Sequence, residues 1–272
     1  MFKVYAHTSA TSSSYTKKYR EGKQLPVIQT KHLFENTTDR EQLAYDLVKM
    51  IFPGSPPEAI KYELVQQGLL NKGKVSLSLD VWQLLDKQLK ELMISWQGPD
   101  IAVYILPIEN GFIKNGIAYR DGICLFVSSR LSMKELHALF AHEYHHMCRR
   151  AFMEEPPTLM DSLMMEGLAE DAVESLFGSD ALGYWTRNYS LAEVQSYWNS
   201  HFVPALYQKG LHHHKSFLFG DDQLNLPPCI GYCTGYRIVQ AFKERCGPYS
   251  INELMHIKSE DIIDGAGFNR FH

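Results

Sequence analysis

The chain has 272 residues, of which 45% are hydrophobic and 21% charged, and its formal net charge is −4. This composition is ordinary for a globular protein, and the mild acidity without long runs of one sign argues against a nucleic-acid or anionic-membrane surface. No apolar run has the length of a membrane span, and the N-terminus lacks the apolar core of a signal peptide. The five cysteines show no disulfide spacing, so we expect reduced thiols and a cytoplasmic protein.

The first third of the chain is predicted to be helical. Apolar residues recur at helical spacing, and clusters of Pro, Gly and Asn separate the segments. We expect helices over about 36–51, 57–69 and 78–96. The apolar stripes on these helices are interpreted as core packing.

Two β-rich apolar runs follow, Ile101–Leu106 and Gly122–Val127, joined by a connection that contains Asn115-Gly116. The strand at 123–127 is our candidate for a sheet edge that pairs with an extended peptide. Ser132-x-x-Glu135 is a capping box, and it predicts a helix that runs to about Arg150.

The remaining chain is predicted to be mainly helical. Thr158-x-x-Asp161 caps a helix over about 159–177, and Gly178 ends it. Further helices are expected over 181–200, from Thr234 to Cys246, and near 251–257, with a loop over 209–228.

The predicted helix before Arg150 carries His142, Glu143 and His146 in the pattern H-E-x-x-H. Residues i and i+4 lie one above the other on one face of a helix, so the two imidazoles can bind one Zn²⁺. Glu143 leans toward the same face and can act on a water bound to the metal. This short pattern can also occur by chance in a chain with 12 histidines. A zinc site therefore requires a third ligand elsewhere in the sequence.

Glu166 is the candidate third ligand, because the 19 residues after His146 suffice to end one helix and return in a second. Glu170 lies one turn later and can accept a hydrogen bond from His142, with Asp171 as the weaker candidate. A solvated helix face is the alternative interpretation of these carboxylates. Gly167 beside them favours close helix packing instead.

Three segments together resemble the DUF2268 family of YjaZ-like proteins, which are predicted zinc-dependent proteases. These segments are His142–His146, Met165–Glu170 and Gly231–Val239, and the resemblance extends from about Trp96 to Phe242. It implies a gluzincin site with one zinc ion per chain, two His ligands and one Glu ligand, and a peptide or protein substrate.

The M1-type aminopeptidases of the wider gluzincin clan carry Tyr-x-x-Gly at the start of a later helix, and Tyr232-Cys233-Thr234-Gly235 is similar. The resemblance implies that the Tyr232 phenol stabilises the oxyanion, with Tyr236 in reserve. Packing of an aromatic residue in the core is the alternative. The Gly-x-Met-Glu-Asn signature of those exopeptidases is absent.

The other histidines have simpler interpretations. His145 lies off the ligand face, and His137 is expected to pack or cap. His212 and His213 are expected in a solvated loop. His214 could reach the cleft, because similar proteins have a His ahead of Leu-Phe-Gly.

We therefore expect an α+β, zincin-like fold in a single catalytic domain over 1–272, with an N-terminal lobe to about 150 and a helical C-terminal lobe over 151–272. The predicted function is zinc-dependent peptide hydrolysis with Glu143 as general base. A zinc-bearing but catalytically silent peptide-binding protein is the main alternative, and a chance motif without metal is the second.

Overall fold

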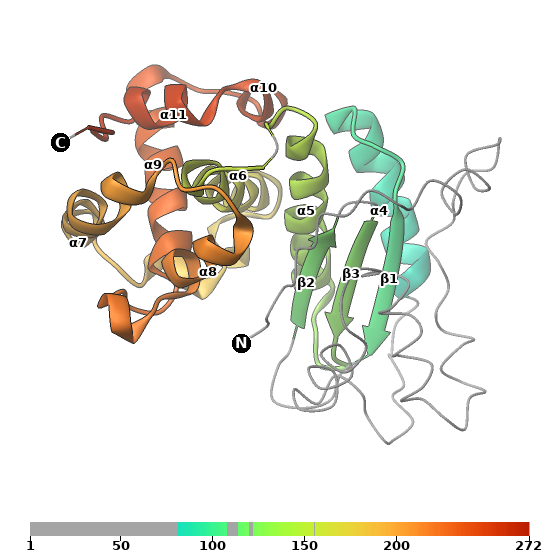
Figure 1. The fold of residues 1–272 in the computed structure, drawn as a ribbon. Coiled ribbons are helices and arrows are strands. Elements are labelled where there is room, and N and C mark those ends of the chain that lie inside the picture. The colour runs from blue at the N-terminus through green and yellow to red at the C-terminus, as the bar shows by residue number, and fades with distance from the viewer. Residues whose placement is uncertain (1–80, 108–113, 120–121, 155, 272) are drawn as a thin grey trace. The chain divides into compact units, whose positions relative to one another are not determined.

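The computed structural model describes residues 81–107, 114–119, 122–154 and 156–271. The helices predicted over 36–51 and 57–69 lie outside these residues. The chain divides into two compact units, Met1–Met147 and Cys148–His272, and each is described by itself. The described elements are mostly helices together with one small sheet, which confirms the predicted α+β class (Figure 1). None of the described helices has both the length and the apolar character needed to cross a bilayer.

Unit 1 contains helix α4 (Val81–Trp96) and most of helix α5 (Met133–Arg150), which carries the H-E-x-x-H motif. The predicted capping box begins α5: Ser132 N–H donates to Glu135 Oε2 at 3.0 Å, and Glu135 N–H donates to Ser132 Oγ at 3.3 Å. Within the motif, Tyr144 stacks on Trp96 at 5.9 Å between ring centroids. Its hydroxyl donates to the carbonyl oxygen of Pro99 at 2.9 Å, so the motif helix is fixed against the end of α4.

The sheet of unit 1 has the strand order β1-β3-β2, with β1 (Ala102–Pro107) parallel and β2 (Lys114–Tyr119) antiparallel to β3 (Gly122–Val127). Both predicted strands are confirmed, and all six residues of β3 are buried, as expected for a continuous apolar run.

Two expectations about this sheet were wrong. The connection around Asn115-Gly116 is strand β2, which the sequence conceals because Lys-Asn-Gly has little intrinsic preference for strands. The strand at 123–127 is the central strand rather than an edge, since β2 pairs along its other side.

Unit 2 is built from helices. The longest are α6 (Leu159–Phe177) and α9 (Ile230–Cys246). The shorter helices α7 (Leu191–Tyr197) and α8 (Leu211–Phe219) lie between them in the chain, and α10 (Ile251–His256) and α11 (Ser259–Gly265) follow α9. The predicted bounds of α6 are confirmed, with a capping box at Thr158 and Asp161 and an end before Gly178.

Other boundaries in unit 2 differ from the prediction. The loop expected over 209–228 contains α8, whose polar His run conceals its helical character. The helix expected from Thr234 begins four residues earlier, at Ile230. Residues 179–202 combine α7 with short turns, including η1 (Ser179–Ala181), η2 (Tyr184–Arg187) and the π-helical turn Trp198–Phe202.

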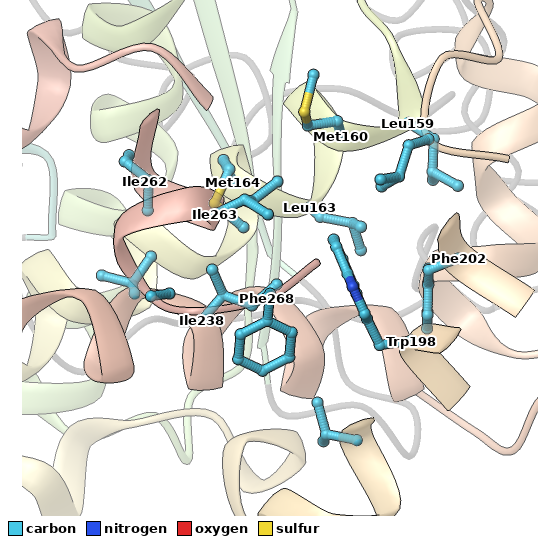
Figure 2. Packing of buried hydrophobic residues seen from close by; sticks show 14 of the residues in the cluster. Leu159, Met160, Leu163, Met164, Trp198, Phe202, Ile238, Ile262, Ile263 and Phe268 are labelled. Atoms are coloured by element: carbon cyan, nitrogen blue, oxygen red, sulfur yellow. The ribbon is translucent and has the colours of Figure 1, made fainter. Parts of the chain in front are cut away.

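The hydrophobic core of unit 2 lies around α6 and α9 (Figure 2). Leu163 of α6, Ile238 of α9 and Phe202 are fully buried members of this cluster. Trp198 contributes the largest buried side chain, and its indole N–H donates to Asn269 O at 2.7 Å. Burial of each such side chain stabilises the fold by about 1.5–3 kcal/mol.

Helices α6 and α9 approach each other closely at two glycines. A Cβ atom on Gly167 would lie 2.2 Å from the carbonyl oxygen of Gly235, and one on Gly235 would lie 2.2 Å from the carbonyl oxygen of Leu163. Because the neighbouring atoms belong to backbone, no side-chain rotation can make room. This contact fixes the position of Glu166 along α6 relative to Tyr236 on α9.

We predict that Gly167→Ala destabilises the protein. Gly→Ala inside a helix ordinarily stabilises by about 1 kcal/mol. Here overpacking against Gly235 is expected to lower the free energy of unfolding by about 1–3 kcal/mol. Urea unfolding followed by circular dichroism measures this free energy. Ser196→Ala, at an exposed position of α7, is the control. An unchanged or raised stability of Gly167→Ala would contradict the close contact.

Candidate metal centre

The two histidines of the motif lie one turn apart on α5 in the arrangement that the spacing predicts. Their ring centroids are 4.6 Å apart, and the rings are nearly perpendicular, at 81°. His146 is buried and His142 is partly exposed. Two imidazoles placed in this way can direct one nitrogen each toward a common ion.

Glu143 lies beside the pair and is only 6% exposed. A Cβ atom on Gly116 would lie 2.5 Å from Glu143 Cγ and 2.6 Å from Oε1, so the backbone of β2 lies directly against this side chain. Burial and the neighbouring Glu143 raise the pKa of the Cys124 thiol on β3, which keeps that thiol protonated. The role of Gly116 was not foreseen, although a glycine in a strand is a known sign of close approach by another group.

Glu166 lies on α6 and is partly exposed. Glu170, one turn later, is 2% exposed, and its Oε2 accepts the backbone N–H of Gly183 at 3.0 Å. Asp171, also on α6, forms an ion pair with Lys243, whose Nζ lies 2.6 Å from Asp171 Oδ1. Burial raises the pKa of the Asp171 carboxyl, and the ammonium of Lys243 opposes this shift.

The side chains of His142, His146 and Glu166 each offer one ligand atom, and these three atoms lie within 4.8 Å of one another. Two imidazole nitrogens and one carboxylate oxygen form a ligand set that catalytic zinc uses.

The two candidate tyrosines of α9 have different surroundings. Tyr236 is buried, and its hydroxyl donates to Glu174 Oε2 at 2.8 Å. Burial and the Glu174 carboxylate raise the pKa of this phenol above its usual value. Tyr232 is partly exposed, and its ring contacts Trp185 and Phe219, with centroid distances of 5.6 and 5.3 Å.

His214 lies on α8 in the interior of unit 2. Its Nε2 donates to the backbone carbonyl of Gln208 at 2.8 Å. Because a carbonyl only accepts, the neutral ring accepts at Nδ1 from the hydroxyl of Ser162, also at 2.8 Å. Both ring nitrogens are therefore engaged within this unit. His145 on α5 is buried and meets Trp96 edge-on at 5.9 Å, as expected for a structural residue.

Comparison with known proteins identifies the family. Residues 81–264 match the family model described as Predicted Zn-dependent protease (DUF2268). The chain is 34% identical over 201 residues to Uncharacterized protein YjaZ of Bacillus subtilis (strain 168), which covers 66% of this chain and 72% of that protein. It is 28% identical over 147 residues to Uncharacterized protein YjfC of the same strain, covering 50% of this chain and 48% of that one. No solved structure matches. The chain belongs to the DUF2268 family of predicted zinc-dependent proteases.

We predict that His214 makes the stability of the protein depend on pH. Burial lowers the pKa of its imidazole below the usual value, although the hydrogen bond to Gln208 opposes this shift. The unfolded chain then takes up a proton at higher pH than the folded one, near the ordinary value of about 6.5. The free energy of unfolding is therefore greatest above that pH and falls below it, by at most about 1.4 kcal/mol per pH unit.

Urea unfolding between pH 5 and 8 measures this effect in the parent and in His214→Gln. The parent is expected to lose its advantage over the variant as the pH falls below about 6.5. Parallel stability curves for the two proteins would assign the pH dependence to other groups.

Proposed function

We propose that the chain is a zinc metallopeptidase of the gluzincin type, with the metal held by His142, His146 and Glu166. The observation that carries the proposal is the convergence of these three potential ligand atoms within 4.8 Å. Zinc bonds of about 2.0–2.1 Å to tetrahedral ligands imply ligand atoms about 3.3 Å apart, which small side-chain rotations can reach. Three protein ligands leave one position for water, as in catalytic rather than structural zinc sites.

A zinc ion bound there would supply a Lewis acid that polarises the substrate carbonyl and acidifies a water molecule. Glu143 is the proposed general base, which takes a proton from the attacking water and later delivers it to the leaving amine. Its carboxylate is nearly buried between α5 and the backbone of β2, a setting in which a proton-transfer group keeps a defined orientation.

Tyr232 is the proposed donor to the oxyanion of the tetrahedral intermediate. A phenol can donate this hydrogen bond without carrying charge. Tyr236, whose hydroxyl donates to Glu174, remains the reserve. Glu170 is the proposed hydrogen-bond acceptor for the ligand His142, in addition to its contact with Gly183.

The substrate is proposed to be a peptide or protein segment in extended form. Because β3 is central, β2 takes over its predicted role as the strand that guides this segment. The absence of a side chain at Gly116 lets this strand lie directly on Glu143. The proposal includes a zincin-like fold and a single catalytic domain over 1–272.

The competing proposal is a zinc-bearing protein that binds peptides without cleaving them. It shares the ligands His142, His146 and Glu166 but gives Glu143 no chemical role. Substitution of Glu143 therefore separates the two proposals, because zinc binding and hydrolysis then respond differently.

We predict that Glu143→Gln retains about one zinc ion per chain but loses hydrolysis. Glutamine keeps the size of the side chain but cannot accept the proton. The loss of kcat is expected to be at least 10²-fold, within the usual contribution of general-base catalysis. Cleavage of a quenched peptide library and metal analysis of the same preparation measure both quantities. Cleavage at the parental rate would remove Glu143 from the mechanism.

We predict that Glu166→Ala instead loses the metal, because only two protein ligands remain. Metal analysis after dialysis against a weak chelator is the measurement. Glu174→Gln, two turns further along α6, is the matched control and should keep its zinc. If Glu166→Ala retains one zinc ion per chain as firmly as the parent, Glu166 is not a ligand.

A further inference from the structure

We propose that Trp185 is a positioning residue that holds the ring of Tyr232, and that Glu170 sets Trp185 through the backbone of Gly183. The inference rests on the proposed function, because it concerns the residue assigned to the oxyanion. It adds a structural reason for Gly183 and Trp185, which the sequence motifs did not single out.

The turn η2 is anchored to both long helices, α6 and α9. On one side, Glu170 of α6 accepts the N–H of Gly183 at 3.0 Å. Thr186, whose side chain is fully buried, closes the turn by donating from its hydroxyl to Gly183 O at 2.8 Å. On the other side, the thiol of Cys233 on α9 lies 3.6 Å from the carbonyl oxygen of Thr186.

The indole of Trp185 packs directly against Gly183. A Cβ atom on Gly183 would lie 2.2 Å from both Cε2 and Cζ2 of this ring. The backbone of Gly183 has φ −57°, which any residue adopts, so glycine is needed for space alone. The indole nitrogen is buried, and it has no hydrogen-bond partner among the described residues. The ring is therefore placed by its fit against Gly183.

Trp185 also contacts Tyr232, the proposed oxyanion donor. The rings of Trp185 and Phe219 both pack against Tyr232, at 5.6 and 5.3 Å and with interplanar angles of 56° and 55°. Such tilted contacts limit rotation of the Tyr232 ring. An oxyanion donor must reach its acceptor within about 2.7–3.1 Å, so a ring released from these contacts loses much of its effect.

These contacts form a brace from α6 to Tyr232. Glu170 follows the proposed ligand Glu166 by one turn of the same helix, so the brace starts next to the metal ligand. It reaches the first turn of α9, where Tyr232 lies, at a point separate from the glycine contact between the helices. The oxyanion donor is thereby fixed relative to the helix that holds the metal ligand.

The kinetic test measures Trp185→Ala and Gly183→Ala as single variants and again in combination with Tyr232→Phe. Both single variants are expected to lower kcat about 10- to 100-fold with little change in KM, the usual cost of a misplaced catalytic group. Trp185→Phe is the conservative variant: it keeps an aromatic ring against Tyr232 and should restore most of the kcat lost in Trp185→Ala, because the indole nitrogen makes no hydrogen bond among the described residues. In Tyr232→Phe, Trp185→Ala should lower kcat little further. Multiplicative losses in the double variant would overturn the proposal, since they indicate a general structural effect.

A second readout does not depend on activity. In protein with ¹⁵N-labelled tryptophan, the indole signal of Trp185 is identified by its loss in Trp185→Phe. Tyr232→Leu should displace this signal, while Tyr249→Leu, which removes a ring stacked on Phe242, should not. If the chemical shift of the Trp185 indole is unchanged in Tyr232→Leu, the proposed contact between the two rings is wrong. If the parent cleaves no peptide, the proposed function fails, and this measurement alone then decides whether the brace exists.

Discussion

The contact between the backbones of Gly167 and Gly235 is the constraint on which the organisation of unit 2 depends. Two helices whose backbones touch cannot slide along or rotate about each other without collision. The glycine of α6 directly follows Glu166, and the glycine of α9 lies three residues after Tyr232. A packing requirement thus fixes where a proposed metal ligand and a proposed oxyanion donor lie within this unit.

In unit 1 a third glycine has a similar effect on different chemistry. Gly116 brings the backbone of β2 against Glu143, while the stacking of Tyr144 on Trp96 holds the helix that carries the two histidines. The general base is thereby nearly buried. Close packing of the backbone or of neighbouring rings therefore restricts the positions of the residues proposed for proton transfer, metal binding and oxyanion stabilisation.

The sequence predicts features that depend on neighbouring residues better than features that depend on contacts between distant parts of the chain. Helix α6 was predicted to the residue because Thr158 and Gly178 act on neighbouring backbone. Strand β2 was missed because its pairing with β3 outweighs the weak strand preference of Asn115-Gly116. The contact of Trp185 with Tyr232 joins residues 47 positions apart, and no pattern in the sequence signals it.

We propose that this chain cleaves peptides with a metal held by His142, His146 and Glu166. The most direct measurement is hydrolysis of a quenched peptide library by the purified protein as isolated, after removal of metal by a chelator, and after addition of zinc. We expect cleavage to disappear with the metal and to return at one equivalent of zinc per chain. Cleavage that survives complete removal of metal, or a fully zinc-loaded protein that cleaves no peptide, would contradict it.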